Sequence, residues 1–448
     1  MSNVTRRQFV EGTGKTAAGV GIAMTAASSA RAAGSNEKIR LALIGCGGRG
    51  SYVARGLIEA GAAITHLCDV NPSKMDRVWK FLSSAQKQQP KFVADMQHVF
   101  DDKDVDGVII ATPDHWHALG TIRACEAGKD VYVEKPHSIN IWESQKMVEA
   151  ARKHKRVVQV GTQNRSVPYA HEAREYIKSG KLGDIPLVRV FNMKDGGEFK
   201  LGESTPQPEG FDWNLWLGPA SQRPFHSKLI QHGWLYYWDF AGGDMLSDGI
   251  HQLDLALMLM GDPPLPKSVR SLGGKYAYPD ADAERPDVQT SSWDYGNFIL
   301  EGENTGYPRY MRKTTLTIRR NDELPYWTQN ATRIEIYGKE LMMTVGRHGG
   351  GWIVQTVQGR LVEKQFGRVP DPWHYDNFLS CMRSRQRPNA DIEIAHNANA
   401  VVHMSNIAHR LGNIGLNYDR ATGRFDNERA NAMLKGPYRK GFEIPDTV

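Results

Sequence analysis

The sequence predicts a doubly wound α/β domain with a parallel sheet, followed by an α+β domain built on a large, mainly antiparallel open sheet. Three observations support this prediction. Short β-branched runs alternate with amphipathic helical stretches between residues 38 and 161. After about residue 185, strand-like runs follow one another with few helices between them. A glycine-rich turn, from Gly45 to Gly50, joins the first predicted strand to the first helix.

The first domain, residues 38–161, is defined by its alternation of strands and helices. Strand–helix–strand units of this length imply parallel pairing, and right-handed crossovers place helices on both faces of the sheet. The predicted strands are Ile39–Ile44, Ala63–Asp69, Gly107–Ala111, Asp130–Glu134 and Val157–Val160. The predicted helices are Tyr52–Ala60, Pro72–Gln88, Trp116–Ala127 and Trp142–His154.

The second domain, residues 162–448, shows a different rhythm. Consecutive alternating runs with glycine-rich turns, such as Gly349 to Gly351, are typical of an antiparallel sheet with one solvated face. The predicted strands are Val188–Met193, Ser291–Leu300, Thr314–Arg320, Arg333–Tyr337 and Trp352–Val357. Helices predicted at Gly249–Met260 and Asp376–Arg383 would cover its other face.

The glycine-rich turn has the spacing of a dinucleotide-binding motif. Gly45 permits the tight turn, Gly47 lets the backbone approach a pyrophosphate, and Gly50 lets helix and strand pack closely. The free N–H groups at the helix start, around Gly48 and Arg49, then face the anion. The motif lies between a strand and a helix, which indicates a Rossmann domain.

Asp69, at the end of the second predicted strand, indicates which dinucleotide binds. Its carboxylate lies about 20 residues after the turn and can accept both ribose hydroxyls of an adenosine. It would repel a 2′-phosphate, and the next residues, Val70 to Pro72, include no cation to bind one. The sequence therefore favours NAD(H), with NADP less favoured.

Other cofactor contacts are expected where the fourth and fifth strands end. Ligands of open α/β sheets bind at the carboxyl edge of the strands. Asp114 at this edge is expected to cap the next helix. The expected contacts are Thr112, Pro113, Trp116, His117, Glu134 and Lys135, with Trp116 and His117 on the nicotinamide side.

Composition excludes several classes of protein. The net charge of +6 falls to +3 without residues 1–32, and the charges are evenly mixed, so no nucleic-acid partner is expected. The four cysteines have no paired spacing, which argues against a disulfide framework and leads us to expect no metal site. No run approaches 18 apolar residues, so no membrane span is predicted.

Residues 1–32 have the pattern of an export signal. Arg6 and Arg7 precede a weakly apolar run from Thr16 to Ala27, and small residues surround Arg31. A charged start, an apolar stretch and a small-residue cleavage site mark a secretory signal, and the adjacent arginines mark its twin-arginine form. We expect cleavage near Ala32 and a periplasmic or otherwise exported protein that uses the twin-arginine machinery.

Two further motifs complete a resemblance to a known family. Glu134-Lys135-Pro136 follows the fifth strand, and Gly249-Ile250-His251-Gln252-Leu253-Asp254 lies on a later predicted helix. With the glycine-rich turn, these motifs resemble the glucose-fructose oxidoreductase and inositol dehydrogenase family, Gfo/Idh/MocA, over nearly all of the chain after the signal. The resemblance implies that Lys135 and His251 face the reactive carbon of a sugar or cyclitol beside the nicotinamide.

The chemistry of alcohol oxidation supports these two residues independently. The hydroxyl proton needs a base while hydride leaves, and histidine serves as base or acid near neutral pH. An ammonium such as that of Lys135 stabilises the alkoxide as it forms and favours neutral imidazole.

The chain departs from the family pattern at one position. The family commonly has Asp four residues before the histidine, where this chain has Ser247, with Asp248 one residue later. Because spacings of three and four share a helical face, Asp248 can still orient the ring of His251 and contact substrate. The resemblance also suggests a substrate contact for Arg165, with a solvated arginine as the alternative.

Export and the resemblance together leave three functions open. Because the periplasm supplies little free nicotinamide, NAD(H) is expected to be tightly bound by an oxidoreductase that acts on a secondary hydroxyl of a sugar, glycoside or cyclitol. An alternative is a glycoside-cleaving enzyme that oxidises C3 transiently and then eliminates; related glycosidases lack the lysine of the E-K-P motif, so Lys135 favours the dehydrogenase. A third is a nucleotide-bound sensor or scaffold.

A homo-oligomer, dimer or tetramer, is expected from the exposed sheet face.

Overall fold

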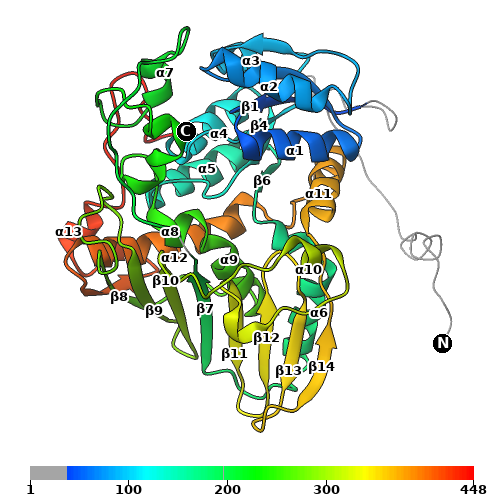
Figure 1. Cartoon of the computed structure of the whole chain (residues 1–448), viewed down its shortest axis with the longest axis vertical. Coiled ribbons are helices and arrows are strands. Elements are labelled where there is room, and N and C mark those ends of the chain that lie inside the picture. Colours follow the sequence, from blue (N-terminus) through cyan, green and yellow to red (C-terminus); the bar gives the residue numbers. More distant parts are fainter. Residues whose placement is uncertain (1–37, 195) are drawn as a thin grey trace, which may run out of the picture. The chain divides into compact units, whose positions relative to one another are not determined.

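Six short runs of mostly apolar residues form the first sheet. The computed structural model describes residues 38–194 and 196–448, so the predicted export signal lies outside the described residues. The strands are all parallel, in the order β3-β2-β1-β4-β5-β6, which confirms the predicted doubly wound sheet (Figure 1). Their bounds are β1 (Arg40–Ile44), β2 (Ala63–Cys68), β3 (Lys91–Val93), β4 (Gly107–Ile110), β5 (Asp130–Val133) and β6 (Val158–Val160).

Every residue of β4 and β5 is buried, because helices cover both faces of this sheet. Asn71 caps α2 by accepting the Ser73 N–H, and Asn140 caps α5 by accepting the Glu143 N–H. The short β3 and α3 were not predicted from the sequence. The helices are α1 (Gly48–Glu59), α2 (Pro72–Leu82), α3 (Gln97–Asp101), η1 (Asp114–Trp116), α4 (His117–Glu126) and α5 (Ile141–Lys153).

The second sheet has ten strands in the order β14-β13-β12-β11-β7-β10-β9-β8-β15-β16. Only β7 and β10 pair in parallel, so the prediction of a mainly antiparallel sheet is confirmed. The strands are β7 (Leu187–Met193), β8 (Ser268–Gly274), β9 (Val288–Asp294), β10 (Ile299–Thr305), β11 (Arg333–Tyr337), β12 (Met342–Gly346), β13 (Trp352–Gln355), β14 (Leu361–Gln365), β15 (Gly415–Asp419) and β16 (Arg424–Phe425).

Helices cover one face of this sheet. Buried side chains of α6, α9 and α12 form one core with inward-facing strand residues such as Val190, Trp293 and Leu300. No helix in the described part of the chain is long and apolar enough to cross a membrane. The helices are η2 (Gln163–Ser166), α6 (Pro168–Lys178), α7 (Trp213–Leu217), η3 (Leu229–Gln231), η4 (Gly233–Tyr236), α8 (Gly243–Ser247), α9 (Ile250–Leu259), α10 (Leu316–Arg320), η5 (Trp327–Gln329), α11 (Asp371–Ser384), α12 (Ile392–Arg410) and α13 (Glu428–Asn431).

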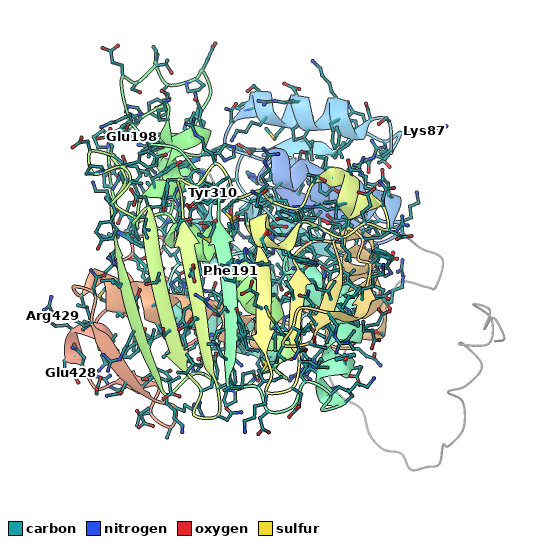
Figure 2. All side chains as sticks on the ribbon, turned by 60° about the horizontal axis from the view of Figure 1, so that its bottom comes forward. Lys87, Phe191, Glu198, Tyr310, Glu428 and Arg429 are labelled. Atoms are coloured by element: carbon teal, nitrogen blue, oxygen red, sulfur yellow. The ribbon has the colours of Figure 1, made fainter. Side chains whose placement is uncertain are left out.

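The other face of the ten-stranded sheet has a layer of charged side chains around Phe191 (Figure 2). Arg333 lies over the Phe191 ring, with its guanidinium carbon 3.8 Å from the ring centroid. Arg189 pairs with Glu301 at 3.2 Å, and Arg333 pairs with Glu335 at 2.6 Å. The Arg189–Glu301 pair joins β7 to β10, and the Arg333–Glu335 pair lies within β11, so the face is charged and its charges are paired.

Two predicted strands of the second domain are wrong. Thr314–Arg320 alternates like a strand, but the Thr315 hydroxyl accepts the Ile318 N–H and the segment forms the short helix α10. Ser291–Leu300 spans two antiparallel strands, β9 and β10, because the chain turns at Gly296, whose φ is +92°. Because the alternation of residues continues through that turn, the sequence pattern does not show the turn.

The helix α11 returns from the second domain to the first sheet. Its Tyr375 and Phe378 pack with Leu41 and Tyr132 in one buried cluster. At the contact between α1 and α11, a Cβ on Gly56 would lie 2.2 Å from the Tyr375 ring. The predicted domain boundary at residue 161 therefore leaves out Tyr375 and Phe378, which belong to the core of the first sheet.

We expect Phe378→Ala to lower the free energy of unfolding by about 3–5 kcal/mol, because it removes a fully buried ring from this core. The matched control on the same helix is Trp373→Ala, whose side chain is 40% exposed. Denaturant unfolding of both variants measures the difference. Equal destabilisation by the two changes would contradict the packing of α11 on the first sheet.

Candidate active site

The turn between β1 and α1 has the geometry of a phosphate cradle. Gly45 has φ +95°, and a Cβ there would lie 2.6 Å from the Ala111 carbonyl carbon. A Cβ on Gly50 would lie 2.2 Å from the Gly45 oxygen, whereas Cβ atoms on Gly47 and Gly48 would meet nothing within 4 Å. No side chain in the described residues caps the start of α1. Its free N–H groups and the open space beside them fit a pyrophosphate.

Asp69 lies at the end of β2, beside this cradle. Its carboxylate accepts the N–H of Cys46 at 2.8 Å and the N–H of Asn71 at 2.9 Å, and it lines a small cavity of about 60 Å³ with Gly45. Lys74 lines the same cavity, although the sequence argument found no nearby cation. Lys74 lies beyond Val70 to Pro72 in the sequence, and the first turn of α2 brings its side chain back to the cavity. The preference against NADP therefore rests on the Asp69 carboxylate alone.

The residues after β4 divide between the cavity and the interior. Thr112, Pro113 and Trp116 line the Asp69 cavity, and the Trp116 indole donates to the Trp216 carbonyl at 3.0 Å. His117 does not line it. Its ring nitrogens lie 2.7 Å from the Pro136 carbonyl and 2.9 Å from the Thr112 carbonyl, so it joins the ends of β4 and β5. The expectation that His117 faces the nicotinamide is therefore wrong; its ring has a structural role.

Asp114 does not cap the helix that follows it, in contrast to the sequence expectation. Its carboxyl is buried, and Oδ2 has no hydrogen-bond partner in the described part of the chain. Burial raises the pKa of Asp114 well above its ordinary value, although Lys135 opposes the shift. Asp114 therefore lies buried near Lys135 in a setting that favours its neutral form.

Glu134 and Arg49 pair with each other across the carboxyl edge. Arg49 Nε donates to Glu134 at 2.7 Å, and its Nη1 lies 3.2 Å from Asp371 of α11. The pair joins the glycine-rich turn to β5 and α11, and Arg49 also lines the neighbouring cleft. Arg49 and Glu134, both expected cofactor contacts, thus pair with each other and hold the glycine-rich turn against β5 and α11.

Lys135, Asp248 and His251 all line one cleft of about 1020 Å³. Lys135 Nζ donates to the Ser247 carbonyl at 2.7 Å, which directs the amine of the first domain towards α8 of the second. Burial lowers the pKa of Lys135, while nearby carboxylates oppose the shift. Sequence motifs more than 100 residues apart therefore place an amine and an imidazole in the same cleft.

His251 is buried, and its Nδ1 has no hydrogen-bond partner in residues 38–194 and 196–448. The ring of His348 stands edge-on to it, with centroids 4.3 Å apart. Burial, His348 and the charges of Arg347 and Lys135 hold the pKa of His251 well below its ordinary value. The imidazole is therefore neutral and able to accept a proton.

Asp248 does not orient the His251 ring, which corrects the sequence expectation. Its Oδ1 pairs with Arg347 at 2.9 Å, and its Oδ2 lies 2.7 Å from Lys313 and 3.2 Å from Lys194. Burial alone would raise the pKa of Asp248, but these three cations hold it well below its ordinary value. Its carboxylate is thus engaged by cations that the sequence argument did not identify.

Arg165 does not reach the cleft, so its expected substrate contact is also corrected. Its Nε donates to both Asp254 oxygens, at 2.7 and 2.8 Å, and its Nη1 lies 2.8 Å from Asp262. The side chain is 3% exposed. Arg165 therefore joins η2 to α9 through a buried ion pair.

Arg347 and His348 are the main cleft residues that sequence analysis missed. They follow β12 and precede Gly349 to Gly351, and His348 has φ +54°. The glycine run was interpreted only as a turn. The adjacent arginine and histidine could have marked it as a functional loop, since loops at the ends of strands commonly hold binding residues.

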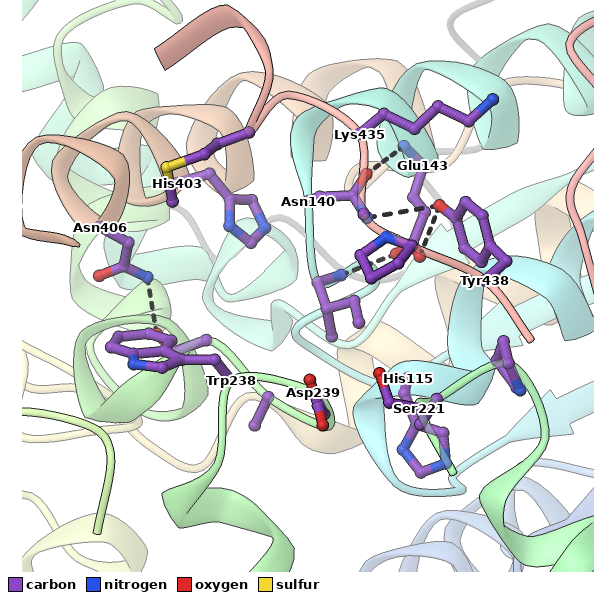
Figure 3. Close-up of a pocket in the computed structure, with 18 of the residues that line it drawn as sticks. His115, Asn140, Glu143, Ser221, Trp238, Asp239, His403, Asn406, Lys435 and Tyr438 are labelled. Carbon is purple, nitrogen blue, oxygen red and sulfur yellow. Dashed lines mark hydrogen bonds between the residues drawn. The ribbon is translucent and has the colours of Figure 1, made fainter. Parts of the chain in front are cut away.

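A separate cavity of about 250 Å³ lies beside the start of α5 and shares no lining residue with the cleft (Figure 3). The Tyr438 hydroxyl donates to Glu143 at 3.0 Å, and the Asn406 amide donates to the Gly242 carbonyl at 2.7 Å. Burial raises the pKa of Glu143 to about 7. The first bond joins the C-terminal segment to α5, and the second joins α12 to the start of α8.

Arg165→Met is expected to lower the free energy of unfolding by about 3–5 kcal/mol, because Asp254 remains buried without its partner. The matched control is Arg387→Met, whose side chain is 67% exposed in its pair with Glu393 and contributes at most about 1 kcal/mol. Urea titration of the two variants measures both values. A near-neutral Arg165→Met would contradict a structural role for the pair.

The low pKa of His251 predicts a titration far from the ordinary histidine value of 6.5. Imidazole ¹⁵N shifts should show His251 neutral throughout pH 6–8, since protonation would add a charge to a buried site beside Arg347. The His251→Gln spectrum assigns the signal, and exposed His98 serves as the internal control. A midpoint near 6.5 for His251 is the contradicting result.

Two family models match this chain. The oxidoreductase family model of an NAD-binding Rossmann fold matches residues 39–162, and its C-terminal alpha/beta domain model matches residues 171–313 and 351–444.

Individual proteins resemble shorter parts of the chain. An NAD⁺-dependent scyllo-inositol 2-dehydrogenase of Bacillus subtilis is 30% identical over 227 residues, or 50% of this chain and 55% of that protein. A glycosyl hydrolase family 109 protein of Shewanella sp. (strain ANA-3) is 33% identical over 172 residues, or 34% of this chain and 38% of that protein. The chain thus spans about half or less of the length of these curated relatives.

The fold is shared with a solved structure of low identity. The WlbA dehydrogenase of Bordetella pertussis, in complex with NADH and UDP-GlcNAcA, has a TM-score of 0.62 and 19% identity, covering 86% of this chain and 99% of that one. This likeness shows the fold, while the two family models together cover most of the chain. The chain belongs to the Gfo/Idh/MocA oxidoreductase family, with its NAD-binding Rossmann domain and C-terminal alpha/beta domain.

Proposed function

We propose that the protein is an exported oxidoreductase with tightly bound NAD(H), and that it acts on a secondary hydroxyl of a sugar, glycoside or cyclitol. The observation that supports this most directly is the convergence of Lys135 and His251 on one cleft, which Arg49 of the phosphate cradle also lines. Family membership and the similarity to an inositol dehydrogenase support the substrate class.

Each part of the proposed reaction has a residue of the cleft to carry it out. Neutral His251 accepts the hydroxyl proton of the substrate, and the Lys135 ammonium stabilises the oxygen as negative charge develops. A dinucleotide held by Gly47, Gly48 and Asp69 would, when bound, supply the hydride acceptor. The substrate alcohol would then become a ketone as its C–H hydrogen leaves with the bonding electron pair, and its hydroxyl proton would pass to His251. Reduction reverses each step.

The proposed export explains why the nucleotide would stay bound. Twin-arginine export carries folded proteins, and residues 1–32 have the pattern of its signal. A cofactor loaded before export must be reoxidised in place by a second sugar or ketone.

The charged face around Phe191 is the surface on which we expect the proposed dimer or tetramer to form.

Denaturing the purified protein is expected to release NAD(H), identified by mass and absorbance. Lys135→Met and His251→Gln should each slow reduction of that nucleotide by sugars about 10²–10⁴-fold. The controls, Lys339→Met and His98→Gln, replace exposed side chains of the same types. An empty purified protein would contradict tight binding, and full activity in the Lys135 and His251 variants would favour a sensor or scaffold without turnover.

The similarity to glycosyl hydrolase family 109 proteins favours one alternative, cleavage of a glycoside after transient oxidation. In that reaction the ketone would acidify a neighbouring proton, which a base removes as the glycosidic group leaves; water would add to the unsaturated ketone, and return of the hydride would restore the alcohol. Release of phenol from an aryl glycoside, without added NAD or a second sugar, would establish the alternative. The proposed dehydrogenase releases no phenol under these conditions.

A further inference from the structure

We infer that the cleft selects substrates with an acidic group, a carboxylate or a phosphate, which Arg319 binds together with Arg347. The inference deepens the proposed function, because it names the class of sugar. It depends on the charge balance of the side chains that line the cleft.

The cations of this region outnumber its carboxylates. Arg347, Lys194 and Lys313 surround Asp248, and Lys194 and Arg285 also pair with Asp244. Lys135 and Arg319 lie within electrostatic range of Asp248. Seven cations and four carboxylates line the cleft itself: Arg49, Arg55, Lys135, Arg319, Arg320, Arg347 and Arg368 against Glu59, Asp248, Asp371 and Asp376. The lining therefore carries three more positive than negative charges.

The neighbouring titratable groups do not correct this balance. Burial holds the pKa values of His251 and His348 well below their ordinary value, so both rings are neutral. Burial favours the neutral form of Asp114 as well. Buried charge of one sign is costly unless an opposite charge pairs with it. An anion in the cleft would supply that charge.

Arg319 is the cation that most needs an anion. It lies on α10, lines the cleft and is half-buried, and its Nε has no hydrogen-bond partner in the described residues. Arg368 lines the same cleft but donates to Asp322 at 2.9 and 3.2 Å. Burial and Arg347 lower the pKa of Arg319, and the opposing effects of Asp248 and Asp371 do not offset them. Planar guanidinium groups bind carboxylate and phosphate through paired hydrogen bonds.

The pyrophosphate of the cofactor does not explain these cations. Its cradle lies at Gly47 to Gly50, at the start of α1, and the cation of that turn is Arg49, which is already paired. Arg319 and Arg347 belong to the second domain, and Arg347 is adjacent to His348, whose ring contacts His251. The surplus charge therefore lies beside the proposed base, on the side where the sugar binds.

The test compares matched acidic and neutral sugars. The pairs are D-glucuronate with D-glucose, D-galacturonate with D-galactose, and glucose 6-phosphate with glucose, so carboxylate and phosphate are separated. We expect at least one acid to show a kcat/KM about 30-fold or more above its neutral partner. Arg319→Gln should lower that ratio about 30-fold, whereas Arg368→Gln, which removes a paired arginine of the same cleft, should preserve it.

Calorimetric binding of the same sugars separates this inference from the proposed function. Arg319-dependent binding of an acid without nucleotide reduction would support the anion site and contradict the oxidoreductase. Turnover of neutral and acidic partners with equal kcat/KM would overturn the inference and leave the proposed function standing. Absence of Arg319-dependent binding for every acid tested would also overturn the inference.

Discussion

The cleft depends on one buried carboxylate, Asp248. Its partners come from distant parts of the chain: Lys194 follows β7, Lys313 precedes α10, and Arg347 follows β12. Without the carboxylate, these three neighbouring cations, of which Arg347 is buried, would repel one another. The same short segment presents the Ser247 carbonyl to Lys135. One ionised side chain thus gathers the loops of the second domain around the amine of the first.

Local patterns predicted most of the fold. The first sheet was predictable because its fully buried strands and amphipathic helices differ in period, and because a glycine turn marks the first crossover. Errors arose where alternation misled. Thr315 to Arg320 alternates like a strand, yet the Thr315 hydroxyl caps this segment and it forms a helix. The strands β9 and β10 were predicted as one strand, because the alternation continues across the turn at Gly296. Local sequence does not reveal which of two competing hydrogen-bond patterns is made.

The site was predictable where a motif includes its own geometry. The glycine turn and Lys135 follow strands, and His251 lies on a helix, whose positions the pattern fixes; Lys135 and His251 line one cleft. The partners of Asp248 and Arg165 could not be predicted, because they depend on contacts between residues up to 99 positions apart. Lys74 was missed for a simpler reason: the first turn of α2 returns it to the Asp69 cavity.

The return of α11 to the first sheet affects when the nucleotide-binding half can form. Tyr375 and Phe378 belong to one of its buried clusters, and Ile444 belongs to the other. A ribosome that has made only the first 161 residues has therefore not yet supplied all of that hydrophobic interior. The interior beneath the glycine-rich turn is therefore complete only after Ile444, near the end of these 448 residues, has been synthesised.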